Sequence, residues 1–225
     1  MYGFLTVTGD RVRRSQEERR AGTRARILDA ASECLLERGY ADTTVAEVQS
    51  RAGMARGTLL HHFPTKVDLI VAAMRHLAEQ RIESFHREAR LVSPTGDRLA
   101  ALVDVAWRDL NSPTFFAGLE LWVAARTDPE LRDALIPVES DLFRKLHEGL
   151  LAVADPDRAD PRSPTLVELT IDLLTGLSMT TLLTSNLGHR ELLLRRWKRA
   201  LAVLVGDLEP DRLVERPARL RGGTP

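Results

Sequence analysis

His61 and His62 are the first residues in this chain whose types suggest chemistry. They stand side by side in "RGTLLHHFPTK", between two segments with helical patterns. Consecutive residues on a helix point about 100° apart, so the two imidazoles cannot easily share one metal ion. The other interpretation is that this stretch is itself a very short helix, held between longer helices and presented to an outside partner.

The remaining reactive side chains form no catalytic or metal-binding pattern. Glu83 and His86 make one Glu-x-x-His pair, whereas a di-iron bundle needs two such pairs and further glutamates. The stretch "GLSMT" at 176–180 lacks the final glycine of a nucleophile elbow, and no strand pattern precedes it. Cys34 is the only cysteine, which excludes an internal disulfide and favours a small core residue. We therefore predict a protein that is not an enzyme and uses no cofactor or metal.

Charge is distributed unevenly, although the net charge is zero. Residues 1–66 carry eleven Lys/Arg and eight Asp/Glu, a net of +3, and the remainder carries 21 and 24, a net of −3. This distribution favours an anion-binding module attached to a mildly acidic body. Five arginines precede residue 21 and could follow a phosphate backbone or minor groove, or form a solvated extension: Arg11, Arg13, Arg14, Arg19 and Arg20.

Helical patterns begin near residue 21. The three-and-four spacing of Ile27, Ala31, Cys34 and Leu35 predicts one buried helical face. That helix is expected to end near Gly39, because glycine disfavours a helix interior. The pattern predicts the first of the supports that must position the short segment.

Two further elements complete this support. Thr44 with Glu47 three residues later has the arrangement of a capping box and predicts the start of a second helix. Gly53 stands where a left-handed closing residue belongs. A short helix at about 56–62 follows, and Thr65 begins another helix that we expect to reach about residue 90.

The rest of the chain also predicts helices. One begins near Asp97, and three begin at an N-cap candidate followed by proline, namely Ser112-Pro113, Asp128-Pro129 and Ser163-Pro164. Pro137 is expected to bend the helix that starts at Pro129. Two last helices are expected at about 164–186 and 189–207. The prediction is an all-α protein of about nine helices, with domains at 21–81 and 82–208 and flexible ends at 1–20 and 209–225.

Two supporting helices followed by a tight glycine turn and a short third helix match the layout of a helix-turn-helix. The second helix of that motif enters the DNA major groove, and side chains near its N-terminal end contact base edges. Arg56 stands at that end, Thr58 can bond a base or a phosphate, and Leu59 can point inward as an anchor. Lys66 starts the following helix and can bind a phosphate.

The stretch "ILDAASECLLERGYADTTVAEVQSRAGMARGTLLHHFPTKVDLI" resembles the N-terminal domain of TetR-family transcriptional regulators. Thr44, the Ala52-Gly53 turn, "GTL", "HF" and Lys66 fall in the family's register, with the helix-turn-helix at about 44–63. The resemblance implies binding to double-stranded DNA, with Thr44, His62 and Lys66 on phosphates and Arg56, Thr58 and neighbouring positions on bases. The full predicted set is Thr44, Arg56, Gly57, Thr58, Leu60, His61, His62 and Lys66.

Leu60 departs from the family pattern, which usually has tyrosine at this position. Leucine cannot donate a phenolic hydrogen bond to a phosphate. Either His61 takes over that contact, or an apolar contact with a thymine methyl replaces it.

A single small DNA-binding head makes too few contacts for useful specificity, so we expect a homodimer on a palindromic site. The last two helices carry apolar and small residues, and two helices from each subunit would form a four-helix bundle, as the resemblance also implies. The alternative is that these faces close the monomer's own core. The predicted interface residues are Leu173, Leu177, Thr180, Thr181, Leu193, Trp197 and Leu201.

The middle helices carry most of the aromatic residues, and in the family such residues line a cavity for a small hydrophobic effector. An ordinary hydrophobic core is the alternative interpretation. Arg126, one turn beyond Trp122, could hold an acidic group of the ligand. The candidate effector residues are Trp107, Phe115, Phe116, Trp122, Arg126, Phe143 and Met179.

The resulting prediction is a DNA-binding transcriptional regulator, a repressor released by an effector that changes the spacing of the two heads. The alternatives are a helical ligand-binding bundle that no longer binds DNA, and a helical enzyme. The opening "MYGFLTVTGD" does not resemble a secretion signal, and Leu173 to Gly188 is too polar for a membrane span. We expect a cytoplasmic protein without a membrane partner.

Overall fold

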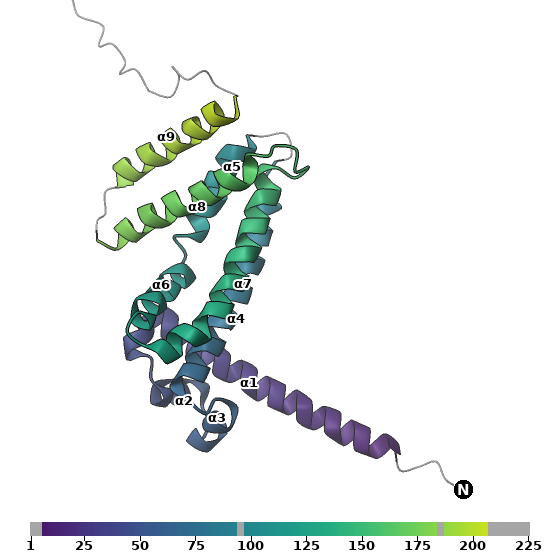
Figure 1. The fold of residues 1–225 in the computed structure, drawn as a ribbon. Helices are drawn as coiled ribbons and strands as arrows, with labels where there is room; N and C mark the ends of the chain where they lie inside the picture. The colour runs from purple at the N-terminus through teal and green to yellow at the C-terminus, as the bar shows by residue number, and fades with distance from the viewer. Residues whose placement is uncertain (1–5, 94–96, 184–186, 207–225) are drawn as a thin grey trace, which may run out of the picture. The chain divides into compact units, whose positions relative to one another are not determined.

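Figure 1 shows the fold as a computed structural model, which describes residues 6–93, 97–183 and 187–206. Within these ranges the chain forms nine α-helices and one 3₁₀ helix, which confirms the predicted all-α class. In chain order they are α1 (Thr6–Asp42), α2 (Val45–Ala52), α3 (Arg56–His62), α4 (Lys66–Ala89), α5 (Arg98–Asp109), α6 (Pro113–Ala125), α7 (Pro129–Ala154), α8 (Ser163–Met179), η1 (Thr180–Leu182) and α9 (Leu187–Val205).

The chain divides into two compact units. The first unit comprises Met1–Glu83 and Ser112–Phe143, and the second unit comprises Ser84–Asn111 and Arg144–Pro225. The first unit therefore differs from the predicted domain at 21–81, because it also contains α6 and the first part of α7. The physical reason is packing between α1 and α6, which brings α6 to the N-terminal helices.

Helix α1 begins at Thr6, well before the expected start near residue 21. Residues 10–21 contain neither glycine nor proline, so nothing in this segment ends a helix. The predicted flexible end at 1–20 is thus described as helix from Thr6 onward, while the predicted end at 209–225 lies outside the described residues. The expected break occurs at Gly39, whose φ of 74° and ψ of 179° interrupt the helical backbone.

The face predicted for α1 is the centre of the first unit's core. Ile27 and Ala31 are fully buried, and Leu35 is nearly so. Val48 from α2 and Leu59 from α3 join the same cluster. Cys34 is also fully buried, and burial raises the pKa of its thiol.

Local signals position α2 as expected. The Thr44 hydroxyl accepts the N–H of Glu47 at 3.2 Å, which is half of a capping box. The Glu47 carboxylate does not complete the box and instead forms an ion pair with Arg38 at 3.1 Å. Gly53 closes the helix with φ 62° and ψ 46°, a left-handed conformation that glycine adopts at little cost.

The later helices begin close to where their caps predict. Asp97 caps α5, Ser112 caps α6, and Asp128 accepts the N–H of Leu131 at the start of α7. Ser163 is an exception, because α8 already includes it and Arg162 occupies the N-cap position. The predicted helix at 164–186 ends as an α-helix at Met179 and continues only as η1.

Among the described residues, one helical segment meets the length and composition of a membrane-spanning helix. It runs from Ser163 to Leu182, and 28% of its apolar window is buried. The low burial reflects an apolar face that is open to solvent, and this face is described below.

Candidate nucleic-acid interface

Helix α3 is anchored on one side and open on the other. Leu59 is fully buried, as predicted, and its carbonyl accepts the N–H of Phe63 at 2.9 Å. Arg56, Gly57 and Thr58 are all exposed at the N-terminal end of the helix. The side chains predicted to contact bases are therefore free to meet an outside surface, and the core does not enclose them.

Gly57 has unoccupied space around it. A Cβ atom added at this position would meet no heavy atom within 4 Å. The fold itself therefore gives no steric reason for glycine here, although glycine costs about 1 kcal/mol relative to alanine inside a helix. A close approach by another molecule would supply such a reason.

Two candidate phosphate contacts flank α2 and α3. Thr44 is exposed, and since its oxygen only accepts from Glu47, its hydroxyl hydrogen remains able to donate to a phosphate. Lys66 is the first residue of α4 and lies 4.7 Å from the centre of the Tyr40 ring. The start of α4 is held by a reciprocal cap: the Asp68 carboxylate accepts the N–H of Thr65 at 3.1 Å, and the Thr65 hydroxyl oxygen accepts the N–H of Asp68 at 3.0 Å.

The C-terminal end of α3 lies in positively charged surroundings. His61 is exposed and His62 is half-buried, with ring centres 5.7 Å apart. Burial lowers the pKa of His62, and the neighbouring His61, Arg20 and Arg24 lower it further. These surroundings favour the neutral form of the His62 imidazole in the free protein. Leu60, between these residues and Leu59, is half-buried.

Sequence reasoning did not place Arg24 at this site, and it treated Arg20 only as part of an N-terminal arm. The Arg24 guanidinium lies 5.2 Å from the centre of the Phe63 ring, directly after α3. Arg20 and Arg24 are four residues apart on α1 and therefore share one face of that helix. The four-residue spacing of these two arginines was the sequence signal that could have identified them. Together they extend the positive surface from α3 onto α1.

Besides the Arg38–Glu47 ion pair, three polar contacts fix α2 against α1. Arg26 donates to the carbonyl of Ala52 at 2.8 Å and so caps the C-terminus of α2. Arg51 forms ion pairs with Glu33 and Glu37, and these pairs raise its pKa. The bonds hold the turn that precedes α3 and with it the orientation of the exposed face.

The structure brings together only part of the predicted effector set. Phe115 contacts Phe116 and Trp122 with ring centres 5.5 and 6.1 Å apart, and Trp122 contacts Phe143 at 5.6 Å. We call these four residues the aromatic cluster. Arg126 is exposed at the C-cap of α6.

The other two predicted effector residues belong to the second unit. Trp107 is half-buried in α5, and Met179 is exposed at the end of α8. Sequence spacing could not assign them to a different unit from the aromatic cluster, because the division depends on which helices pack together.

Glu139 is a buried charged residue beside the aromatic cluster that sequence reasoning missed. Its side chain is 9% exposed, and neither carboxylate oxygen has a hydrogen-bond partner among the described residues. Burial raises the pKa of this carboxyl, while the nearby Trp122 indole and the Arg81 charge oppose that increase. The Arg81 guanidinium also lies 5.5 Å from the centre of the Phe115 ring. No local sequence pattern marks this glutamate.

Most of the predicted dimer residues line one apolar groove between α8 and α9 in the second unit. The groove has a volume of about 860 Å³, and its lining includes Leu173, Leu177, Thr180, Leu193 and Trp197. Leu173 is 46% exposed. Trp197 is oriented by a hydrogen bond from its indole nitrogen to the Thr170 hydroxyl at 3.1 Å.

Two predicted dimer residues do not line the groove. Leu201 is fully buried and packs inside the second unit, which agrees with the alternative that part of this face closes the monomer's own core. Thr181 is half-buried in η1 and is not part of the lining.

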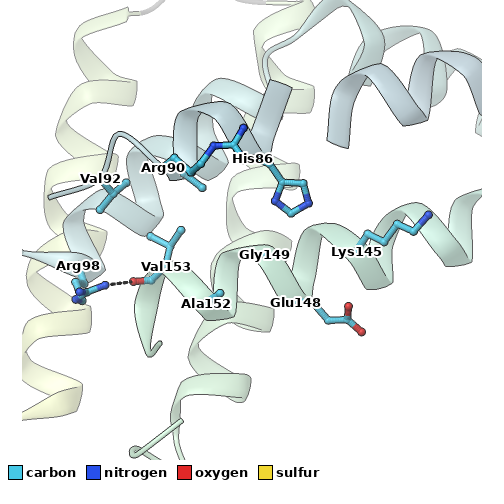
Figure 2. Close-up of a pocket in the computed structure, with 10 residues that line it drawn as sticks. His86, Arg90, Val92, Arg98, Lys145, Glu148, Gly149, Ala152 and Val153 are labelled. Atoms are coloured by element: carbon cyan, nitrogen blue, oxygen red, sulfur yellow. Dashed lines mark hydrogen bonds between the residues drawn. The ribbon is translucent and has the colours of Figure 1, made fainter. Parts of the chain in front are cut away.

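Figure 2 shows a second hollow, of about 400 Å³, in the same unit. It is lined by ends of α4 and α7 and by Arg98, which donates to the carbonyl of Val153 at 3.4 Å. Its other basic residues are His86, Arg90 and Lys145. None of the predicted effector residues lines this hollow.

Comparison with known proteins decides the family. The model of "Bacterial regulatory proteins, tetR family" matches residues 27–73. A Corynebacterium efficiens protein, the HTH-type transcriptional repressor AcnR, is 32% identical over 156 residues, which cover 68% of this chain and 72% of AcnR. The chain belongs to the TetR family.

Further relatives agree with this assignment. The HTH-type transcriptional regulator CymR of Pseudomonas putida is 37% identical over 123 residues, which cover 55% of this chain and 61% of CymR. The crystal structure of the multidrug binding protein EbrR complexed with imidazole matches with a TM-score of 0.57 and 28% identity, covering 87% of this chain and 97% of EbrR. This TetR-family chain is a DNA-binding transcriptional regulator with a helix-turn-helix, and it is not an enzyme.

Proposed function

We propose that this TetR-family regulator is a repressor that binds a palindromic operator as a homodimer and is released by a small hydrophobic effector. The observation that carries the DNA contact is the geometry of α3. Leu59 is fully buried, whereas Arg56, Gly57 and Thr58 are exposed at the N-terminal end of the helix. Arg20 and Arg24, near His62 at the C-terminal end of α3, support attraction to phosphates.

A gel shift on DNA from upstream of the gene tests the DNA contact. The protein should form a discrete complex whose affinity falls steeply as salt rises, because bound phosphates release counterions. A duplex of scrambled sequence serves as the control and should bind weakly. Absence of a complex on every upstream fragment would favour the alternative, a helical bundle that binds small molecules without binding DNA.

The apolar groove between α8 and α9 supports the dimer proposal. Leu173, Leu169 and Leu204 are about half exposed on these two helices. Pairing α8 and α9 with the same helices of a second subunit would remove this surface from water. Because a two-fold axis makes the patch self-complementary, one groove suffices for both subunits.

A charge placed in the groove tests the dimer. Leu173→Glu should convert the dimer to a monomer in light scattering, since two carboxylates would be buried near the symmetry axis. Ile136→Glu is the matched control, because Ile136 is 55% exposed on α7 and lies outside the groove. A dimer that survives Leu173→Glu at micromolar concentration would refute the proposed interface.

The aromatic cluster is the proposed effector site. Its rings offer apolar surface, and Glu139 offers a buried carboxylate beside Trp122. Crystal structures of EbrR hold imidazole and proflavin. An effector with an apolar body and a positive group would suit both parts of this site.

Binding at this site would act through linkage. The effector would bind more tightly to a conformation in which the spacing of the two DNA-binding domains does not match the two half-sites. The difference between its binding free energies for the two conformations sets the loss of DNA affinity, on the order of 1–3 kcal/mol in typical cases. Proflavin binding to the DNA-free protein, followed by its fluorescence anisotropy, tests the site. Trp122→Leu should weaken binding and the exposed-site control Val123→Leu should not, whereas equal affinity in both variants would place the ligand elsewhere.

A further inference from the structure

Inside the first unit, a series of side-chain contacts connects α6 to the start of α4. Lys66, the candidate phosphate contact, has its ammonium group 4.7 Å from the centre of the Tyr40 ring. Its side chain is half-buried, so the ring supports one side of the ammonium group while another side remains open to solvent. A cation over an aromatic face is attracted to it, and this attraction limits where the flexible lysine side chain can go.

Tyr40 is held in turn by a residue that is 80 positions away in the sequence. The Glu120 carboxylate on α6 accepts the backbone N–H of Tyr40 at 2.9 Å. The same carboxylate occupies the space that a Cβ at residue 39 would need, so Gly39 makes this approach possible. Gly39 has a φ of 74°, a backbone conformation that also favours glycine.

The segment held by Glu120 leads directly to the other candidate phosphate contact. The Thr43 hydroxyl donates to the Gly39 carbonyl at 2.7 Å and is fully buried. Thr44, the N-cap of α2, follows at once. Glu120 therefore anchors a short segment with Tyr40 near its start and Thr44 at its end.

We propose that Tyr40 and Glu120 are positioning residues for DNA binding: Tyr40 holds the Lys66 ammonium in place for a phosphate, and Glu120 couples α6 to that clamp. The inference rests on the proposed contact of Lys66 with DNA. Helix α6 also carries Phe115, Phe116 and Trp122 of the aromatic cluster. Under this proposal, a change in α6 alters the position of the Lys66 ammonium through the Tyr40 backbone. Release of the Glu120 bond would free the segment 39–44 and weaken both phosphate contacts together.

A double-mutant cycle tests the role of Tyr40. The probe is a duplex that the full-length wild-type protein selects from a random pool, and affinity is measured by fluorescence anisotropy at several salt concentrations. Tyr40→Leu should weaken binding by about two- to fivefold per subunit, because leucine keeps the packing but loses the ring face. Tyr40→Phe should retain wild-type affinity.

The cycle is completed in a Lys66→Ala background. If Tyr40 acts through Lys66, then Tyr40→Leu should cause no further loss there, and the salt slope of Tyr40→Leu should approach that of Lys66→Ala. The same fractional loss in both backgrounds would overturn the role of Tyr40. If Lys66→Ala itself changes nothing, the Lys66 contact fails instead, and the two failures are thus distinguishable.

Paired variants test the role of Glu120. Glu120→Gln and Glu120→Ala remove the same charge, but only glutamine keeps an oxygen that can accept the Tyr40 N–H. Binding should stay near wild type in Glu120→Gln and weaken at least twofold in Glu120→Ala. Glu88→Ala, which removes a partly exposed glutamate that pairs with Arg108 at 2.6 Å in the second unit, controls for loss of a surface ion pair. Equal affinities of Glu120→Gln and Glu120→Ala would overturn the proposed coupling.

Discussion

Replacing Gly57 by alanine should improve the fold and impair the function. Position 57 is the second residue of α3, and an added methyl group meets no protein atom within 4 Å. Alanine is favoured over glycine in helices by up to about 1 kcal/mol, and less near a helix end, so we expect a gain of about 0.5–1 kcal/mol in the free energy of unfolding. The exposed methyl group buries no apolar area within the protein, so propensity is the whole effect.

Binding to DNA should change in the opposite direction. If the backbone of α3 meets the DNA at Gly57, a methyl group must either displace the helix or open the contact beside Arg56 and Thr58. Loss of one well-placed base or phosphate contact costs about 1–3 kcal/mol, so affinity for the selected operator should fall at least about fivefold.

Urea unfolding followed by circular dichroism measures the first effect, and fluorescence anisotropy with the operator measures the second. Gly188→Ala is the matched control, because Gly188 is also the second residue of its helix and also has nothing within 4 Å. It should gain similar stability without losing DNA affinity. Unchanged DNA affinity in Gly57→Ala would show that α3 does not approach DNA closely at this residue, and lower stability would contradict the local geometry.

The remaining predictions concern Lys66, Arg56, His62 and Glu139. Lys66→Ala should weaken binding to all duplexes alike and lower the slope of log affinity against log salt concentration by about 0.9 per subunit. Arg56→Ala should instead relax the sequence preference at one base position. Unchanged DNA affinity in both variants would contradict both assignments. The pKa of His62 is lowered in the free protein, and a phosphate would favour its charged form, so DNA binding should take up protons and strengthen as pH falls from about 7.5 towards 6. His62→Gln should reduce this pH dependence, and an identical pH profile in the variant would place His62 away from phosphate. The pKa of Glu139 is raised by burial, so its ionisation destabilises the fold and stability should fall as pH rises from the ordinary value of 4.5 through the raised pKa. Glu139→Gln should therefore be more stable than the wild type at pH 7.5, by about 1 kcal/mol or more, and should lose this advantage at low pH in thermal melts. A constant difference across pH would show that folding does not raise the pKa of Glu139.

The DNA-binding elements could be predicted from the sequence because their signals are local. The Thr44 cap and the left-handed Gly53 turn each follow from residue type and from spacing within one helix turn. Backbone sterics and hydrogen bonds that act over three or four residues determine such features, whatever the rest of the chain does. The N-cap at Asp97 and the all-α class follow in the same way.

Tertiary structure decided what depends on contacts between distant residues. Glu120 reaches Tyr40 across 80 positions, and Glu139 loses its water only because several helices pack around it. Packing inside the second unit buries Leu201, although its helical spacing matches that of residues that line the open groove. Periodicity identifies which residues share a face of a helix, but only the packed neighbours determine whether that face meets the core, a groove or solvent.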